Sequence, residues 1–405
     1  MMARPKADKK TELLRLVEER ALAKKQRLDL VPYFPKEIVS DILLRLPPET
    51  LQSLRFVCKA WHKITLTHDF IDTHLRQTEP VLIFQTSVGK ESSQEKPNTF
   101  SVEAKLLQKG SLSIFPQPEV QPSSNFILKF LAVKDGKIDV GEFNVTCLGK
   151  IRATCNGLIL LDDKMKKGGL IVMNPVTKEL CGLPPGTIFP PHYESYGLAY
   201  CRSTREYKLV HLFQDEMRFV GCEILTLGTR SWKAIDGPSM GLFKRFCFHP
   251  VFALGALHWI PRIGHNNYVV SLAMDEEKFH KTPLPTSDRS NDTILEMGGL
   301  LSFLTREKRN QIDVWVLKEL HGEDWTKRYS ITSGWVKRMV PLYARFNGEI
   351  VFKDDKGFLY AYDLQLKVVK KIEMEKGFEP GYGLGLPHVN TIVSWRKVKN
   401  GEDVW

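Results

Sequence analysis

A loose repeat of glycine-led apolar runs is the feature that most constrains the fold of this 405-residue chain. Such runs begin at Gly157, Gly197, Gly255, Gly299 and Gly348, and successive starts are 40 to 58 residues apart. Each run is short, is rich in Val, Ile, Leu, Phe and Trp, and leads through a polar turn into a second run. Short apolar runs bounded by Gly, Pro, Asn and Asp are typical of all-β chains.

The repeat length favours a β-propeller, because a blade of four strands needs about 40–50 residues. Further runs from residue 80 onward are expected to form strands: PVLIF (80–84), NFILKFLAV (125–133), GGLIVMNP (168–175), YKLVHLF (207–213) and QIDVWVLKEL (311–320). The repeat is too degenerate to establish closure of a ring, so a sandwich of two packed sheets remains an alternative. Residues 86–100 are polar and are expected to form a mobile surface loop.

Residues 34–75 predict helices instead of strands. Pro35 can begin a helix that Pro47 ends, and Thr50 can cap a second helix. A third short helix is expected through Phe70–Leu75. The predicted fold class is therefore α+β and multidomain, with three N-terminal helices followed by an all-β, propeller-like (kelch-like) domain. The expected boundaries are 1–30 for a charged leader that is helical or mobile, 31–78 for the helical domain and 79–400 for the β domain.

The apolar side chains of the two longer helices each share one arc, at about 100° per residue. The arcs contain Ile38, Val39, Ile42, Leu43 and Leu46 in the first helix, and Leu51, Leu54, Val57, Cys58, Trp61 and Ile64 in the second. Leu44 and Phe56 fall outside these arcs, among polar residues. Single exposed apolar residues are common, but two of them beside a Pro-Pro turn also fit a surface that binds a partner.

The order of residues in this helical segment resembles the F-box. The matching positions are Phe34-Pro35, Ile38, Ile42-Leu43, Leu46-Pro47, Leu51, Leu54-Arg55, Val57-Cys58-Lys59 and Trp61. Two positions depart from the family pattern, since Phe34 stands where Leu is usual and Ser53-Leu54 where Arg-Phe is common. Both changes keep the helical amphipathy or exchange one large apolar group for another.

The β region resembles the F-box-associated (FBA) interaction domain of the large plant F-box family. The resemblance is carried in the family's order by ATCNGLILL, VMNPVTKELCGLP, YGLAY, EYKLVHLF, GTRSWKAI, GALHWI, SLAMDEEKFHKTPLP, GGLLSF, IDVWVLKE and DWTKRYSI. These segments cover roughly residues 150–335.

The two resemblances imply the substrate-recognition subunit of an SCF-type (Skp-cullin-F-box) E3 ubiquitin ligase. The F-box would dock on a Skp-family adaptor, and through it on a cullin-RING ligase, while the β domain would hold an unknown protein substrate for ubiquitination. No catalytic residue and no cofactor is implied. The residues expected to face or shape the adaptor site are Pro35, Ile42, Leu46, Pro47, Leu51, Val57 and Trp61, to which the helical wheel adds Leu44 and Phe56. Ile42 and Trp61 also fit the internal core of the helices.

Composition argues against several other classes. No run approaches the roughly 18 apolar residues of a membrane span, and no apolar segment follows the basic N-terminus, so we expect neither a membrane partner nor a secretory signal. The seven cysteines include no C-x-x-C pair, which fits the nucleus or the cytoplasm. The net charge of +11 is spread along the chain among acidic residues, and we do not expect nucleic-acid binding.

Motifs for enzymatic chemistry are absent from the sequence, which has no phosphate-binding loop, dinucleotide fingerprint, H-E-x-x-H or G-x-S-x-G. The eleven histidines are dispersed, none is at ligand spacing from a Cys or a carboxylate, and no metal site is expected. His258 alternates with apolar neighbours, which indicates a structural or surface role. The alternative function is a propeller-fold binding protein or enzyme with no ligase role.

Overall fold

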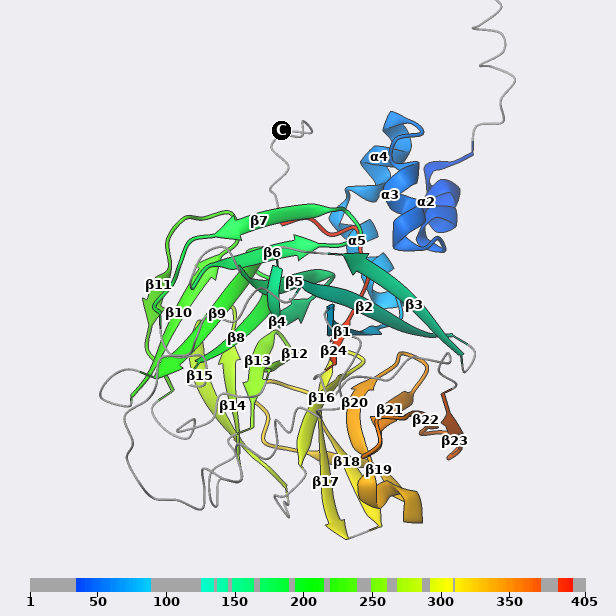
Figure 1. The fold of residues 1–405 in the computed structure, drawn as a ribbon, viewed down its shortest axis with the longest axis vertical. Coiled ribbons are helices and arrows are strands. Elements are labelled where there is room, and N and C mark those ends of the chain that lie inside the picture. Colours follow the sequence, from blue (N-terminus) through cyan, green and yellow to red (C-terminus); the bar gives the residue numbers. More distant parts are fainter. Residues whose placement is uncertain are drawn as a thin grey trace, which may run out of the picture. The chain divides into compact units, whose positions relative to one another are not determined.

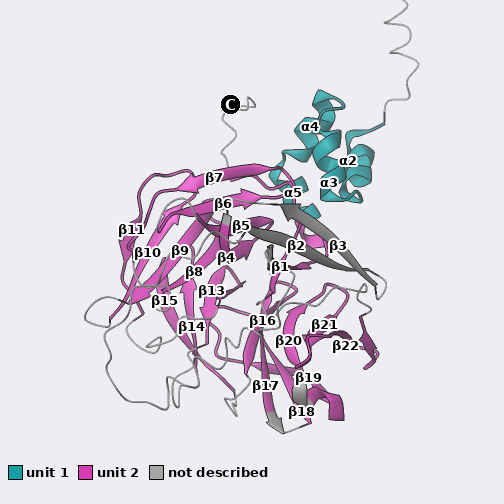
Figure 2. Ribbon diagram, in the orientation of Figure 1, with its two compact units in different colours: residues 1–74 teal, residues 75–405 magenta. Residues whose placement is uncertain are grey.

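The computed structural model describes residues 34–88, 125–134, 137–144, 148–163, 168–188, 194–214, 219–238, 249–260, 268–285, 292–308, 310–372 and 385–395. The chain divides into two compact units, residues 1–74 (unit 1) and 75–405 (unit 2), as Figure 2 shows. The leader predicted at residues 1–30, and the part of the predicted loop that follows residue 88, lie outside the described residues.

Four helices lie between residues 36 and 77, where the sequence predicted three. They are α2 (Lys36–Leu44), α3 (Pro48–Leu54), α4 (Lys59–Thr65) and α5 (His68–Gln77). The predicted second helix is two helices, because a turn at residues 55–57 ends α3 and the extended backbone of Cys58 (φ −156°) begins α4. Among the described residues, no helix has the length and apolar character needed to cross a membrane.

Prolines determine where the first two helices end and begin. Pro47 is the N-cap of α3 and Pro48 is its first residue, whereas Thr50, the predicted cap, lies inside α3. A proline fixes its own φ and has no backbone N–H, so it suits the first turn of a helix and ends the helix before it. At α5, the hydroxyl of Thr67 accepts a hydrogen bond from the backbone N–H of Phe70 at 3.4 Å and caps the helix.

The core of unit 1 is small and contains one buried histidine. Leu43 and Leu51 are fully buried, and Phe70 is nearly so. His74 on α5 is also buried, and its Nε2 donates a hydrogen bond to the backbone carbonyl of Leu46 at 2.9 Å. The Leu46 carbonyl lies just after the end of α2 and has no hydrogen-bond partner within that helix, so the bond from His74 satisfies it.

Unit 2 contains six four-stranded antiparallel sheets among the described residues. We number them as blades 1 to 6. Blade 1 comprises β24 (Leu386–His388), β1 (Val81–Val88), β2 (Asn125–Lys134) and β3 (Lys137–Asn144). Blade 2 comprises β4 (Leu148–Cys155), β5 (Leu158–Asp163), β6 (Leu170–Asn174) and β7 (Glu179–Leu183). Blade 3 comprises β8 (Glu194–Cys201), β9 (Glu206–Gln214), β10 (Val220–Thr226) and β11 (Lys233–Ile235).

The second half of unit 2 repeats this arrangement. Blade 4 comprises β12 (Val251–Ala253), β13 (Ala256–Trp259), β14 (Tyr268–Ala273) and β15 (Lys278–Pro283). Blade 5 comprises β16 (Thr293–Met297), β17 (Leu300–Lys308), β18 (Gln311–Leu317) and β19 (Thr326–Thr332), and a 3-10 helix, η2 (Gly334–Arg338), follows it. Blade 6 comprises β20 (Val340–Ala344), β21 (Glu349–Lys353), β22 (Leu359–Asp363) and β23 (Val369–Lys371).

The blades form a closed ring. The first-edge strands β4, β8, β12, β16, β20 and β24 each lie against the next one, and β24 lies against β4. Figure 1 shows the blades following one another around the ring in chain order. The C-terminal strand β24 pairs with β1, with Leu82 opposite Pro387, so blade 1 contains strands from both ends of unit 2. The predicted propeller is therefore confirmed, and the ring excludes the sandwich alternative.

Four of the five repeat glycines lie in the turn between the first and second strands of a blade. Gly157, Gly255, Gly299 and Gly348 have φ values between 75° and 89°, which strain any residue with a Cβ. The glycine-led run is thus the second strand of each of these blades, and the sequence missed the weakly patterned first strand. Gly197 differs, because it lies inside β8, where a Cβ would be 2.6 Å from Leu257 of blade 4.

Apolar clusters pack neighbouring blades against each other. Alternate residues of a strand point to opposite faces of its blade, so Val210 and Leu212 of β9 pack on Leu257 and Leu272 of blade 4. Further clusters of described residues join blades 4 and 5, 5 and 6, 6 and 1, and 1 and 2.

Asn174, at the end of β6, anchors the segment that follows β24. Its side chain is fully buried, and its Nδ2 donates hydrogen bonds to the backbone carbonyls of Thr391 (3.0 Å) and Val393 (2.8 Å). Its Oδ1 accepts a hydrogen bond from the backbone N–H of Val176 at 2.9 Å, which supports the turn that follows β6. The hydroxyl of Thr391 donates to the carbonyl of Asn156 at 2.8 Å, so two turns of blade 2 hold the C-terminal segment.

We expect Asn174→Ala to lower the free energy of unfolding by about 2–4 kcal/mol, because two buried carbonyls lose their donor. The measurement is urea unfolding of the full chain, followed by tryptophan fluorescence. Asn347→Ala is the matched control, since the Asn347 side chain supports only an exposed turn, and it should cost less than about 1 kcal/mol. Equal losses in the two variants would contradict the anchoring role.

Candidate functional site

Unit 1 carries two groups of exposed apolar side chains. Phe34, Ile38 and Ile42 follow each other at four-residue spacing along and before α2, and Phe56 and Val57 lie in the turn between α3 and α4. Between 46% and 76% of the surface of each of these five residues is exposed, with Phe56 at 76% and Ile42 at 50%. We call these five residues the apolar surface of unit 1. Exposed apolar groups concentrated on a small unit mark a site of protein interaction.

The predicted adaptor-site residues differ widely in exposure. Pro35, Ile42, Pro47, Phe56 and Val57 are exposed, so a partner can touch their side chains. Leu44, Leu46 and Trp61 are half-buried. Leu51 is fully buried, so it can shape the surface but cannot contact a partner directly.

Only part of the predicted apolar arc of α2 is buried. Leu43 is its fully buried residue and Leu44 is half-buried, whereas Ile42, which the sequence also fitted to the core, is exposed. Leu44, which the wheel placed outside the apolar arc, is half-buried, and its role at the adaptor site stays a prediction. A nine-residue helix that packs against few neighbours can bury only part of a wide apolar arc, and the arc alone does not say which part.

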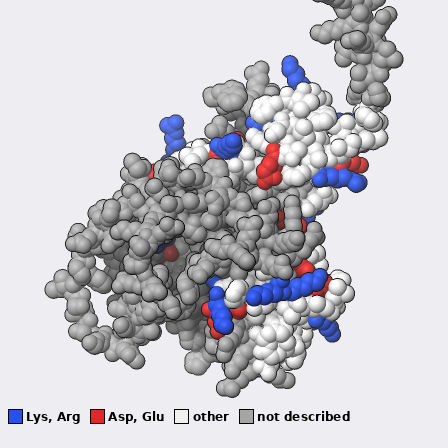
Figure 3. All heavy atoms as spheres, turned by 45° about the vertical axis from the view of Figure 1, so that its right-hand side comes forward, with Lys and Arg blue, Asp and Glu red and all other residues white. Residues whose placement is uncertain are grey.

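Charge on the described surface is mixed. In the view of Figure 3, several described Lys and Arg side chains stand next to Asp or Glu side chains. Neighbouring charges of opposite sign reduce the field that would attract a polyanion. The described side chains on this face therefore form no patch of a single charge.

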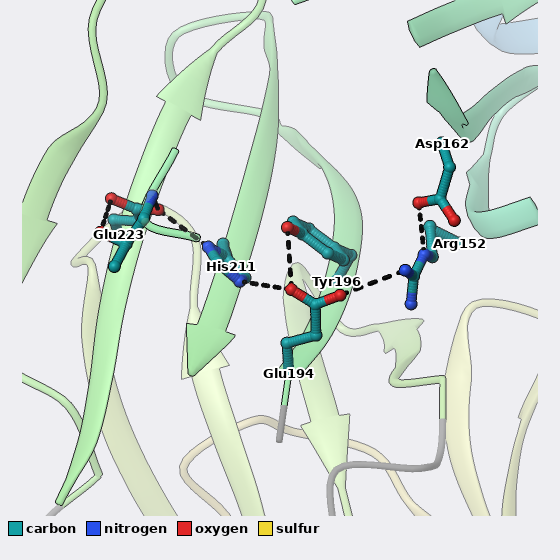
Figure 4. Close-up of polar contacts among 7 residues, drawn as sticks. Arg152, Asp162, Glu194, Tyr196, His211 and Glu223 are labelled. Carbon is teal, nitrogen blue, oxygen red and sulfur yellow. Dashed lines mark hydrogen bonds and ion pairs between the residues drawn. The ribbon is translucent and has the colours of Figure 1, made fainter. Parts of the chain in front are cut away.

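A buried polar network lies between blades 2 and 3 (Figure 4). His211 of β9 is fully buried between two carboxylates: its Nδ1 is 2.8 Å from Glu223 of β10, and its Nε2 is 3.4 Å from Glu194 of β8. Arg152 of β4 joins the network from blade 2, at 3.1 Å from Glu194 and 2.6 Å from Asp162.

Pairing across the strands creates this network. Tyr196 and His211 are directly opposite each other on β8 and β9, as are His211 and Glu223 on β9 and β10. Tyr196 stacks on His211 with ring centroids 4.3 Å apart, and its hydroxyl donates to Glu194 at 3.3 Å. His211 points to the face of β9 opposite to Val210 and Leu212, so the centre of that face is polar.

The network favours the charged form of His211. Burial by itself lowers the pKa of His211, but the carboxylates of Glu194 and Glu223 outweigh burial, and the net pKa is raised. Burial by itself raises the pKa values of Glu194 and Glu223. Hydrogen bonds from His211 and other donors outweigh burial, and both pKa values are below their usual range. Because His211 is fully buried, no substrate can reach its ring, and the network acts as an ionic link between two blades.

His258 on β13 is the opposite case, a buried neutral histidine. Its Nε2 donates to the carbonyl of Ala253 at 3.0 Å, and its Nδ1 accepts from the hydroxyl of Ser271 at 2.7 Å. Burial lowers its pKa to about 4. This side chain is structural and lies in the middle of blade 4.

An open hollow of about 330 Å³ lies at one end of blade 6. Its lining mixes aromatic and charged side chains: Trp335, Met339, Asp354, Asp355, Lys356, Phe358, Tyr360 and Lys371. Lys371 lies over the ring of Phe358, with its Nζ 3.9 Å from the centroid, and the Tyr360 hydroxyl donates to Asp354 at 3.2 Å. Such a lining suits a peptide side chain or a small polar ligand better than a purely apolar one.

Sequence reasoning missed the network because its members come from five strands of two blades. The search for histidines at ligand spacing in the sequence did not find the histidine–carboxylate contacts of the fold, in which His211 lies between two glutamates and both His280 and His321 face Glu276. Only the strand register brings Tyr196, His211 and Glu223 together. The one available signal was a histidine in the middle of the apolar run YKLVHLF.

Comparison with known proteins identifies both units. The F-box domain family matches residues 33–73, and the family described as F-box associated beta propeller domain matches residues 104–383. Among relatives from Arabidopsis thaliana, F-box protein CPR1 is 26% identical over 73% of this chain and 72% of its own length. F-box protein At3g07870 is 22% identical over 84% and 87%, and F-box protein At1g30790 is 25% identical over 92% and 97%.

We expect the stabilising effect of His211 to depend on pH. Because its pKa is raised in the folded chain, its contribution is fully present below its unfolded pKa of about 6.5 and is lost as the pH rises through the folded value. The difference in free energy of unfolding between wild type and His211→Gln should therefore be larger at pH 6 than at pH 9. Urea unfolding at both pH values measures this difference. Subtracting the variant from wild type at the same pH removes the contribution of groups that titrate equally in both.

His68→Gln is the control for this experiment, because His68 is an exposed residue of α5. Its difference from wild type should be small at both pH values. A His211→Gln difference that is the same at pH 6 and pH 9 would show that the buried ring is not charged.

Proposed function

The chain belongs to the F-box associated beta propeller family, and from that membership we propose that it is the substrate-recognition subunit of an SCF-type ubiquitin ligase. The F-box domain match at residues 33–73 and the F-box relatives support a role in substrate recognition. In this proposal unit 1 binds a Skp-family adaptor, and through it a cullin-RING ligase, while the propeller binds the protein to be ubiquitinated.

The apolar surface of unit 1 is the observation that carries the proposal. Phe56, Val57 and Ile42 are at least half exposed although they are among the largest apolar side chains of a unit with few core residues. Burying such side chains against a partner contributes roughly 1.5–3 kcal/mol each. A helical partner with an apolar groove would cover them, which is the contact expected of an adaptor.

In the proposed role this chain brings the substrate close to the ubiquitin-charged enzyme and carries out no chemical step itself. Holding a substrate near the ubiquitin-charged enzyme raises the effective concentration of its lysines there. The ring of His211 is fully buried among its partners and so cannot serve as a substrate site. The alternative of a propeller enzyme would instead have to use an accessible site, such as the hollow on blade 6.

Blade 6 is where we place the substrate. It carries several of the exposed large apolar residues of unit 2, namely Val340, Phe346, Phe358, Leu366 and Val368. Val340 and Phe358 lie at the end of the blade where the β21–β22 turn lines the hollow, whereas Phe346, Leu366 and Val368 lie at the opposite end. Phe346 and Leu366 lie in the turns β20–β21 and β22–β23, and the Leu364 N–H donates to the Gly348 carbonyl at 3.2 Å, which joins these two turns. Turns on a rigid propeller are suited to recognition because they vary without disturbing the core.

We expect Ile42→Asp and Phe56→Asp each to weaken adaptor binding roughly 30-fold, the effect of losing about 2 kcal/mol at an interface. Both side chains are exposed, so the fold should be retained. The measurement is co-purification of a Skp-family adaptor with the full chain, followed by titration calorimetry of the purified pair.

Leu366→Asp is the matched control, because Leu366 is 72% exposed but lies on blade 6. It should leave adaptor binding unchanged. Wild-type recovery of the adaptor by both unit 1 variants would remove the apolar surface from the interface. Failure of the folded wild-type chain to bind any Skp-family adaptor would remove the ligase role and leave a propeller-fold binding protein or enzyme.

A further inference from the structure

Three side chains with metal-binding atoms meet where blade 4 adjoins blade 5. Glu276 lies in the turn between β14 and β15, His280 lies on β15, and His321 lies in the connection between β18 and β19. The two histidines are 41 positions apart in the sequence. The ring architecture, which sets blade 5 beside blade 4, is what brings them together.

We infer that Glu276, His280 and His321 form a zinc-binding site that links blade 4 to blade 5. Two imidazole nitrogens and one carboxylate oxygen are a common protein ligand set for Zn²⁺, with a fourth position left for water. The site is separate from the adaptor surface and from the hollow on blade 6, so it does not depend on the proposed ligase role.

The distances fit zinc coordination. Zinc–ligand bonds of about 2.0–2.1 Å in a tetrahedron place neighbouring ligand atoms about 3.3 Å apart. The Nε2 of His280 is 3.3 Å from one oxygen of Glu276, and the Nε2 of His321 is 3.0 Å from the other. All three ligand atoms lie within 4.8 Å of one another. The residues retain enough exposure for the small rotations that would bring them to one ion.

The contacts of these groups with described residues also suit a bound cation. The Nε2 of His280 is buried and makes no hydrogen bond to any described residue. No described Lys or Arg forms an ion pair with Glu276, whereas the adjacent Glu277 is held by both Lys208 and Lys233. Among the described residues, the charged or titratable groups paired with the Glu276 carboxylate are thus the two imidazole rings. The rings of His280 and His321 are 4.7 Å apart and nearly perpendicular, with both Nε2 atoms toward that carboxylate.

A zinc ion here would act as a cross-link. It would bind the folded ring, in which the two blades are adjacent, and not the unfolded chain, so binding would raise the stability of the propeller. Mg²⁺ prefers oxygen ligands and should not bind this set.

The test is titration of the full chain with zinc chloride after treatment with EDTA and dialysis, followed by calorimetry. We expect one zinc equivalent at this site, no binding of magnesium chloride, and a higher unfolding temperature with zinc. The double variant His280→Gln/His321→Gln should lose this equivalent, with affinity reduced at least 100-fold, and zinc should no longer raise its unfolding temperature.

Two variants serve as matched controls. Glu277→Gln removes a neighbouring carboxylate, and His68→Gln removes an exposed histidine of unit 1, and both should keep the zinc equivalent. Circular dichroism in EDTA establishes whether the double variant folds, and if it does not, the single variant Glu276→Gln, at an exposed position, takes its place. Wild-type zinc affinity in the folded variant, or no zinc binding by the wild-type chain, would overturn the inference.

Discussion

The pairing of β24 with β1 is the contact on which the propeller depends. It joins strands about 300 residues apart in the sequence, yet β24 has only three residues. So short a strand contributes few ladder bonds, and the hydrogen bonds of Asn174 and Thr391 hold the segment that follows it. With the ring closed, each first-edge strand has a neighbour on both sides, which protects edges that would otherwise be open to other chains.

Within the ring, packing between blades is apolar in most places and ionic in some. The apolar clusters are non-directional, whereas the network around His211 requires particular strand registers on two blades. Charges so deeply buried are tolerated only when they are paired, because removing one partner leaves an uncompensated charge. The network therefore restricts the strand register within blade 3, and the position of blade 3 relative to blade 2, more strictly than apolar contacts would. The cluster of Glu276, His280 and His321 is likewise formed by polar side chains of two neighbouring blades, here blades 4 and 5.

Unit 1 follows from the limits of a small helical unit. Its helices have seven to ten residues, and its core consists of few side chains. A unit of this size cannot bury every apolar residue of its sequence. Because α2 turns Leu43 inward, Ile38 and Ile42 remain in water. A partner that covered α2 would remove these apolar side chains from water. The local packing of α2 therefore leaves exposed the residues that the proposed docking role needs.

The sequence determined the fold class of both units, because helical and strand periodicities are local and the glycine turns recur at blade length. It predicted Phe56 and Val57 as partner contacts, and both are exposed, although their binding role stays a prediction. Only the tertiary structure decided which side of α2 is buried, how many blades close the ring, and that Thr50 is not a cap. It alone also joined His211 to Glu223 and His280 to His321. The reason is physical: periodicity fixes which residues share a face, whereas strand register and ring closure fix which faces meet.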